Sequence, residues 1–160
     1  MARRMIVVHG GVGNSPANLD GCEAAAKAGL ALMQAGEDSL AGAIAAAVIM
    51  EDDPRFNAGT GSSLLMDGET ICMDASVMDS RGRLGAVAGL QKIKNPILVA
   101  RAIAPTPHWM LIGGGARAFA LQKGCEESYV VTEKSRNTYD RVMAALAAGS
   151  GADIPQEWHD

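Results

Sequence analysis

The sequence has few stretches that can form strands and many that can form helices. Short apolar runs typical of strands lie at residues 5–8, 63–66, 70–78, 84–91 and 109–112. Helical composition covers residues 19–35, 39–50, 95–104, 113–123 and 135–148. This mixture indicates a layered α+β or α/β protein. Because these strands can form only a small sheet beneath so many helices, we expect another chain to complete the sheet.

The composition excludes several classes of function. The 160 residues suffice for one domain with a core, and 19 glycines with only 4% aromatic residues suit close packing of small side chains. The net charge is −4 and the basic residues are scattered, so neither nucleic acid nor a membrane surface is an expected partner. Cys22, Cys72 and Cys125 are far apart, which predicts reduced thiols in a cytoplasmic protein and neither a disulfide framework nor a zinc site.

Several residues mark the ends of the predicted elements. Asp38 or Ser39 is placed to cap the helix at 39–50, and Pro96 suits the first turn of the helix that follows it. The helix at 39–50 is apolar almost all round, so we expect it to lie between layers. Asp67-Gly68 predicts a turn between two strands.

A glycine-rich turn, HGGVG at residues 9–13, follows the first apolar run. It fits neither the GxGxxG dinucleotide pattern nor the GxxxxGK[ST] phosphate loop. The turn either reverses the chain tightly or brings backbone N–H groups close to a reaction centre, where only glycine permits close approach. The glycines at 113–115 also precede a helix, but packing of that helix on a strand explains them better than an anion site does.

The acidic residues and histidines form no complete catalytic set. The acids at 51–53 open an irregular loop, where the carboxylates are usually solvated, although the backbone carbonyls of such a loop can hold a hard cation. Asp74 and Asp79 have an odd spacing and so lie on opposite faces of a strand, and Asp74 is expected to bond backbone. Neither His108 nor His159 has a partner nearby in sequence, and no serine lies in a GxSxG motif. The residues alone predict a half-domain with glycine-rich loops.

Several segments together resemble one enzyme family. In chain order they are HGGVG at 9–13, DPRFNAGTGS at 53–62, MDASVMD at 73–79, GAVAG at 85–89, KNPI at 94–97 and the stretch 108–120. Each segment alone is weakly specific, but their order and spacing over residues 5–125 resemble the plant-type L-asparaginase/isoaspartyl peptidase family of N-terminal-nucleophile hydrolases.

This resemblance implies an α+β fold and a missing partner. The fold would be a four-layer αββα sandwich, completed by a separate β chain from the same precursor. Residues 1–133 would form the α-chain half of the sandwich, and residues 134–160 a C-terminal helix and flexible linker. The β chain would begin with Thr, whose hydroxyl is the nucleophile and whose α-amine is the base. The family also implies an (αβ)2 heterotetramer, no cofactor for catalysis, and a structural Na⁺ or K⁺.

Only a few functional positions carry over to this chain. Asn57 would position the β-chain Thr, although Asn in this place can also merely stabilise its turn. Gly10 and Gly11 would lie near the cleavage site, and self-cleavage would follow His159 and Asp160. The Na⁺ would be bound by the backbone carbonyls of Met50, Glu51, Asp53, Phe56, Ala58 and Thr60. We also expect the Phe56 ring to be buried and Gly59 to let the loop fold tightly.

The resemblance implies an amidohydrolase that cleaves L-asparagine and β-aspartyl dipeptides. Asp160 departs from the Gly that commonly precedes the Thr in asparaginases of this family, so glycosylasparaginase and an aspartate-directed threonine endopeptidase stay open as alternatives. The first is disfavoured because the glycine turn lacks a Trp, and the second because residues 135–160 contain no large insertion. A non-catalytic protein that retains the fold is the alternative from another class.

Overall fold

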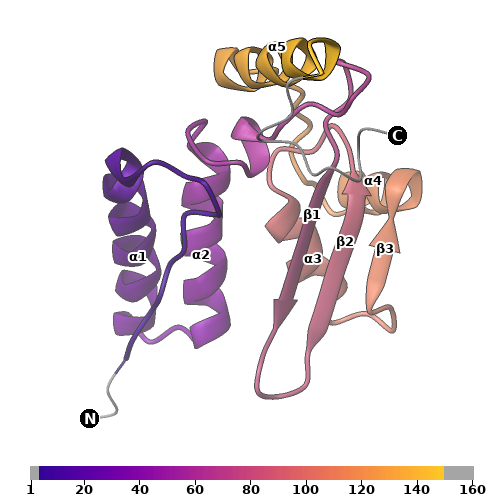
Figure 1. The fold of residues 1–160 in the computed structure, drawn as a ribbon. Helices are drawn as coiled ribbons and strands as arrows, with labels where there is room; N and C mark the ends of the chain where they lie inside the picture. The colour runs from indigo at the N-terminus through magenta and orange to yellow at the C-terminus, as the bar shows by residue number, and fades with distance from the viewer. Residues whose placement is uncertain (1–3, 150–160) are drawn as a thin grey trace.

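The computed structural model describes residues 4–149 of the chain. The helices are α1 (Leu19–Gln34), α2 (Ser39–Asp52), α3 (Pro96–Ile103), α4 (Gly113–Gln122) and α5 (Glu133–Ala147), with short 3₁₀ helices η1 (Pro16–Asn18) and η2 (Gly59–Gly61). The strands are β1 (Met73–Met78), β2 (Leu84–Leu90) and β3 (Met110–Ile112). Figure 1 shows α1 and α2 side by side next to the sheet, with α5 across one end. The described chain is therefore an α+β structure.

The sheet is small and mixed. Its order is β1-β2-β3, with β1 antiparallel and β3 parallel to β2. Val87 in β2 lies opposite Ala75 on one side and Leu111 on the other. Because parallel neighbours need a crossover connection, the chain passes through α3 between β2 and β3.

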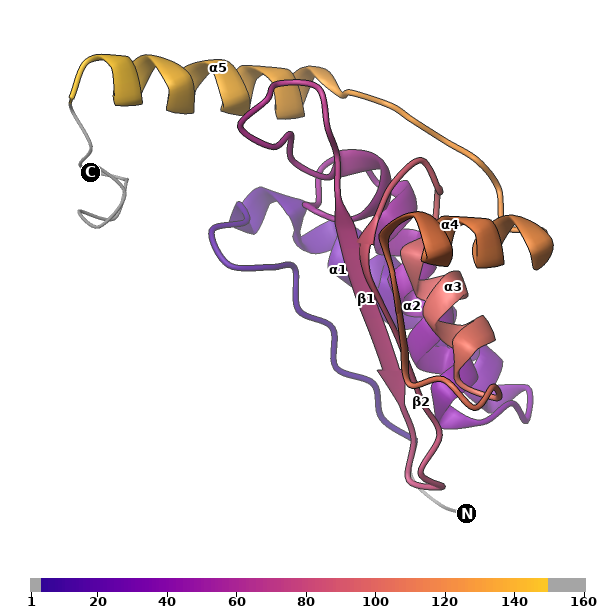
Figure 2. The ribbon, with the colours of Figure 1, turned by 90° about the vertical axis from the view of Figure 1, so that its right-hand side faces the viewer.

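The main core lies between the sheet, α3 and α4. Figure 2 shows α3 and α4 on the same side of the sheet. Its largest fully buried side chains include Leu90, Ile93 and Ile103. Gly85 of β2 lets α3 approach closely, because a Cβ at this position would lie 2.2 Å from the carbonyl oxygen of Ala100. Burying an aliphatic side chain of this size contributes roughly 1.5–3 kcal/mol, so these residues fix α3 and the sheet as one unit.

Helices α1 and α2 pack through glycine. A Cβ at Gly29 would lie 2.5 Å from the Gly42 carbonyl oxygen, and one at Gly42 would lie 2.9 Å from that of Gly29. On another side of α2, Ile44 belongs to the core that includes sheet residues such as Val77 and Val87. Helix α2 thus lies between α1 and the main core, which confirms the prediction drawn from its all-round apolar composition.

The helices agree with the sequence patterns. Asp38 caps α2 by accepting a hydrogen bond from the Ala41 N–H at 2.9 Å, and Pro96 occupies the first turn of α3. Thr132 caps α5 in the same way, through the Ser135 N–H. The strands expected at 70–78, 84–91 and 109–112 are confirmed as β1, β2 and β3, each of them shorter than its expected range.

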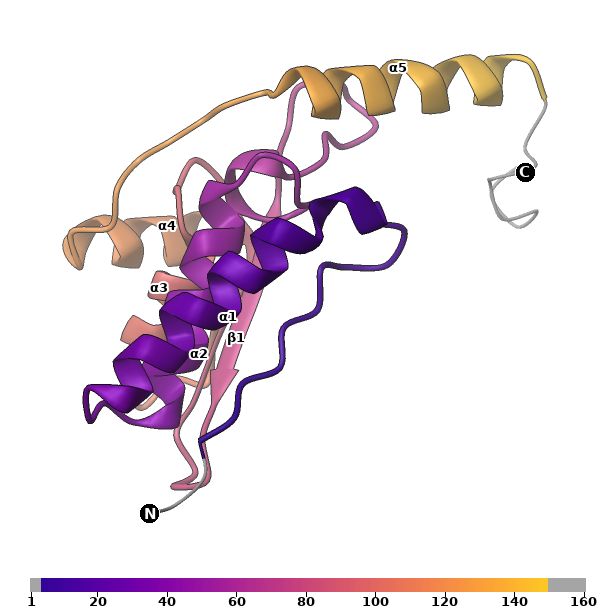
Figure 3. The same ribbon diagram turned by 90° about the vertical axis from the view of Figure 1, so that its left-hand side faces the viewer.

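Two strand predictions are wrong. Residues 5–8 are extended but pair with no strand in the described chain, and Met5 and Val7 are 71% and 86% exposed. Figure 3 shows this segment running beside α1. Residues 63–66 form only an arm of the Asp67-Gly68 turn, closed by a bond of 2.8 Å from the Leu65 N–H to the Thr70 carbonyl. Both runs have strand composition, but a strand requires a neighbour, and the described residues supply none.

Candidate functional site

The glycine turn and the loop after α2 meet around a cleft of about 460 Å³. One wall comes from residues 9–14, which carry Gly10 and Gly11, and the other from Met50 and residues 55–58, which carry Asn57. Lys134 and Thr138 of α5 line its edge together with Ser63. The structure therefore brings Asn57 next to the glycine turn at 9–13, although 44 to 48 positions separate them in the sequence.

Phe56 sets the spacing of the two walls. Its side chain is 1% exposed, as predicted. On one edge of the ring, a Cβ at Gly10 would lie 3.3 Å from Cε1, and on another, a Cβ at Gly21 of α1 would lie 2.7 Å from Cε2. Glycine at both positions lets the ring fit between the turn and the start of α1. The aromatic ring thereby holds the glycine turn next to Asn57.

The glycine turn is tight. Gly11 and Gly13 have φ angles of 92° and 74°, which favour glycine. The Gly11 N–H donates to His9 Nδ1 at 3.1 Å, and the Asn14 N–H donates to the Gly11 carbonyl at 3.3 Å. The motif is therefore a tight turn, and this turn lines the cleft.

Asn57 is exposed and uses only its oxygen locally. Oδ1 accepts from the Ser63 N–H at 3.0 Å and from the Ser63 hydroxyl at 3.1 Å. The Asn57 Nδ2 has no hydrogen-bond partner among residues 4–149. The amide oxygen thus closes the loop, while the amide nitrogen of a cleft-lining residue remains available to donate.

The loop after α2 offers backbone oxygens. Met50 cannot receive a normal helical hydrogen bond because Pro54 has no N–H, and the Arg55 N–H that Glu51 would receive donates to Asp53 Oδ1 at 2.9 Å. Gly59, with φ of 50°, folds so tightly that its Cβ would lie 2.4 Å from the Glu51 carbonyl oxygen. The expected role of Gly59 is confirmed. Free carbonyls at a helix C-terminus are oxygens of the kind that hard cations bind.

The other residues expected to bind Na⁺ lie in the same loop. The Asp53 carbonyl accepts from the Phe56 N–H at 3.2 Å, and the Ala58 carbonyl accepts from the Gly61 N–H at 3.0 Å. Thr60 is in η2. Each carbonyl oxygen has two lone pairs, so these bonds leave one free on Asp53 and on Ala58. The donor set is compatible with a monovalent cation. Among residues 4–149, no three His, Cys, Asp or Glu side chains cluster to hold a metal ion.

Glu51 differs from the solvated acid that the sequence suggested. It belongs to α2 and not to the following loop, and only 6% of it is exposed. Oε1 accepts from the Ile97 N–H at the start of α3, at 3.0 Å, while Oε2 has no partner in the described part of the chain. Burial raises the pKa of this carboxyl to about 7. The sequence could not show that Glu51 is buried, because three consecutive acidic residues give no sign of which side chain faces the interior.

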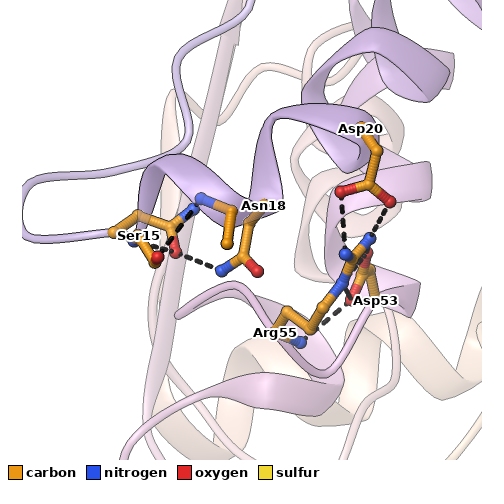
Figure 4. A network of polar contacts seen from close by, with 7 residues as sticks. Ser15, Asn18, Asp20, Asp53 and Arg55 are labelled. Atoms are coloured by element: carbon orange, nitrogen blue, oxygen red, sulfur yellow. Dashed lines mark hydrogen bonds and ion pairs between the residues drawn. The ribbon is translucent and has the colours of Figure 1, made fainter.

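Arg55 was not predicted to have any role. Figure 4 shows its guanidinium between Asp20 at the start of α1 and Asp53 in the loop. Nη1 and Nη2 donate to the two oxygens of Asp20 at 2.9 and 3.0 Å, and Nη2 donates to Asp53 at 2.7 Å. Hydrogen bonding to Arg55 lowers the pKa of both carboxyls. These residues are polar and separated by 35 positions, so no periodic pattern could have paired them.

The remaining predicted positions lie apart from the cleft. Asp74 accepts from the Gly89 N–H at 2.7 Å, which confirms that it bonds backbone. Asp79 instead pairs with Arg83, so the two aspartates serve separate partners. His159 and Asp160 lie outside the described residues. No helix within residues 4–149 has the length and apolar character to cross a membrane.

The sequence profile of a family described as asparaginase matches residues 2–156. The chain belongs to this asparaginase family. Similar members include a plant-type L-asparaginase of Pyrococcus abyssi, 40% identical over 90% of this chain and 49% of its own length. An isoaspartyl peptidase/L-asparaginase of Macaca fascicularis is 39% identical over 86% of this chain and 48% of its own length. An isoaspartyl peptidase of Escherichia coli is 33% identical over 94% of this chain and 50% of its own length. The chain thus spans about half the length of these family members.

Proposed function

We propose that this chain is the α part of an autoprocessed threonine amidohydrolase that cleaves L-asparagine and β-aspartyl dipeptides. The proposal rests on one observation: in a member of the asparaginase family, the Gly10–Gly11 turn and Asn57 meet at one cleft around the buried Phe56 ring. Similar family members are named as L-asparaginases and isoaspartyl peptidases, and they are about twice as long as this chain. The other half of the site would come from a β chain of the same precursor.

The exposed apolar surface supports a partner chain. Trp109, Met110 and Ile112, in or next to β3, are 76%, 56% and 67% exposed, and β3 has only one neighbour in the described sheet. The unpaired extended segment at 5–8 adds Met5 and Val7. Open edges with apolar side chains favour pairing with further strands. We infer that β-chain strands complete a four-layer αββα sandwich, and that two such αβ units form the (αβ)2 heterotetramer.

The chemistry would use a nucleophile from the β chain and positioning groups from this one. The N-terminal Thr hydroxyl would attack the side-chain amide carbon of the substrate, with its own α-amine as base. Asn57 Nδ2 would donate to this Thr and hold its rotamer, without adding a charge that would perturb the amine. Self-cleavage after Asp160 would release this Thr, with Gly10 and Gly11 near the scissile bond.

A monovalent cation would stiffen the Asn57 loop. The backbone carbonyls of Met50, Glu51, Asp53, Phe56, Ala58 and Thr60 would hold Na⁺ or K⁺. The free carbonyls at the end of α2 support this assignment. Bound there, the ion would neutralise the negative end of the helix and take no part in the reaction.

The test begins with the codon after Asp160. Thr at this position supports the proposal, and a stop codon or a residue other than Thr, Ser or Cys overturns it. The precursor is then expressed whole and assayed with L-asparagine, β-aspartyl-leucine and an N-glycosylated asparagine. Self-cleavage and hydrolysis of the first two substrates are expected. Hydrolysis of the glycosylated substrate alone would assign the chain to a glycosylasparaginase, and a mature protein that cleaves none would be non-catalytic.

A further inference from the structure

Arg55 ends a series of polar contacts that lead from the glycine turn along the start of α1 to the Asn57 loop. Asn14 follows the glycine turn, and its Oδ1 accepts from Asn18 Nδ2 at 2.7 Å, just before α1 begins. Asp20 in the first turn of α1 binds Arg55, which is bound in turn by Asp53. The polar contacts therefore lead from Asn14, after the glycine turn, to the start of α1, and from there through Arg55 to Asp53 in the Asn57 loop. Figure 4 shows Asn18, Asp20, Arg55 and Asp53.

The guanidinium of Arg55 forms a fork of paired hydrogen bonds with each of its two aspartates. This fork restrains the positions of the aspartates more than it stabilises the folded chain. Arg55 makes two parallel bonds to Asp20, and its Nε and Nη2 both donate to Asp53, so the planar group fixes the orientation of both carboxylates. The Arg55 and Asp20 side chains are 40% and 67% exposed, and exposed ion pairs contribute little to the free energy of unfolding. Loss of the fork should therefore loosen the loop without unfolding the chain.

Asn57 is two residues from Arg55, and its loop has no other side-chain hydrogen bond to α1 in the described chain. Phe56 contacts α1 at Gly21 through its aromatic ring, but an apolar contact does not fix the orientation of the loop as the two parallel bonds from Arg55 to Asp20 do. We propose that Arg55 is a positioning residue, which sets Asn57 relative to the Gly10–Gly11 turn by clamping the loop to the start of α1. This inference rests on the proposed function.

The chain contains a matched control. Arg83 also bridges two aspartates, Asp79 and Asp38, and its side chain is 41% exposed, like that of Arg55. It ties the β1–β2 turn to the start of α2, and it does not line the cleft. Arg81 also pairs with Asp38 and Asp79, so Arg83→Met removes one of two arginines from that bridge. It controls for the loss of a half-exposed arginine ion pair outside the cleft.

The experiment compares Arg55→Met, Arg55→Lys, Asp20→Asn, the double variant Arg55→Met/Asp20→Asn and Arg83→Met in the whole mature protein. The kcat and KM for β-aspartyl-leucine and the melting temperature are measured for each. A displacement of about 1 Å at a reaction centre costs ~10²-fold in rate, so a loosened loop should lower kcat about tenfold. We expect this loss for Arg55→Met, with KM changed less than about twofold.

The pattern across the variants decides the proposal. Asp20→Asn should lower kcat, the double variant should lose no more than Arg55→Met, and Lys should not restore the rate because it lacks the fork. Arg83→Met should keep the wild-type kcat at a similar melting temperature. Equal kcat values for Arg55→Met and Arg83→Met, or losses that multiply in the double variant, would overturn the proposal.

A second measurement tests the role of Arg55 even if the proposed function is wrong. If the wild-type protein hydrolyses neither L-asparagine nor β-aspartyl-leucine, the clamp is judged by hydrogen exchange at the amides of residues 57–63. Faster exchange in Arg55→Met than in Arg83→Met then supports the clamp, because amide protection reports local opening. Equal exchange in the two variants overturns it.

Discussion

Replacement of Gly21 by alanine tests whether Phe56 is held as tightly as the structure indicates. Gly21 lies in the first turn of α1 and is buried. In most helical positions Gly→Ala is favourable by up to about 1 kcal/mol, because alanine has the higher helix propensity. Here the new Cβ would lie 2.7 and 2.8 Å from two atoms of the Phe56 ring and 3.0 Å from Arg55 Nη2. The ring cannot retreat easily, because Gly10 closes its other side.

The two effects can be compared in magnitude. An extra methyl group in a packed site costs about 1–3 kcal/mol, which exceeds the gain of about 1 kcal/mol from helix propensity. We therefore expect Gly21→Ala to lower the free energy of unfolding by about 1 kcal/mol. We also expect a loss of kcat, because the displaced ring carries Asn57 with it.

Gly115→Ala is the control for this measurement. Gly115 lies in the first turn of α4, and a Cβ there would meet no atom within 4 Å. Both substitutions change the unfolded chain in the same way, so urea unfolding of the whole protein compares the folded states directly. Gly115→Ala should be neutral or stabilising by up to about 1 kcal/mol. If Gly21→Ala stabilises the protein as much as Gly115→Ala does, the packing argument for Phe56 is refuted.

Three further predictions concern the proposed reaction. Asn57→Ala should lower kcat more than tenfold. Ser63→Ala keeps the Ser63 N–H bond to Asn57 and should retain most activity. Equal losses in the two variants, or a loss that merely follows unfolding, would leave Asn57 a purely structural role. Exchange of Na⁺ and K⁺ for tetramethylammonium should lower the melting temperature and the activity, and indifference of both would exclude the cation. Asp160→Ala should slow self-cleavage of the precursor, followed by gel electrophoresis, and maturation at the wild-type rate would exclude a role for that carboxylate.

The sequence predicted the features that depend on neighbouring residues. Helix limits followed from caps and glycines, as with Asp38 at α2, and the tight approach at Gly59 followed from its motif. Burial of Phe56 and the backbone bond of Asp74 were also predicted correctly. The cap and the Gly59 turn are set by local geometry. The burial of Phe56 and the backbone bond of Asp74 were predicted from residue type, and the residues they contact, such as Gly21 and Gly89, were not predicted.

The errors concern contacts between distant residues. The run at 5–8 has strand composition, but a strand forms only when a partner is present, and composition does not show where that partner lies. Glu51 and Asp52 are adjacent acids, yet one is buried against α3 and the other is exposed, because α2 turns only one of them toward the Ile97 N–H. The pairing of Arg55 with Asp20 likewise depends on how α1 packs beside the loop.

The groups that line the cleft suit positioning better than reaction. The Ser63 hydroxyl donates to the Asn57 amide oxygen, which is too weak a base to activate it, and His9 Nδ1 already accepts from the Gly11 N–H. Arg55 is neutralised by two carboxylates. The Ser63 hydroxyl, the His9 imidazole and the Arg55 guanidinium are thus each engaged in contacts that hold the turn and the loop. The Lys134 amine, whose pKa is lowered by burial, and the Thr138 hydroxyl line the edge of the cleft. In the proposed reaction, the N-terminal Thr of the β chain brings its own base and would lie next to the Asn57 amide nitrogen.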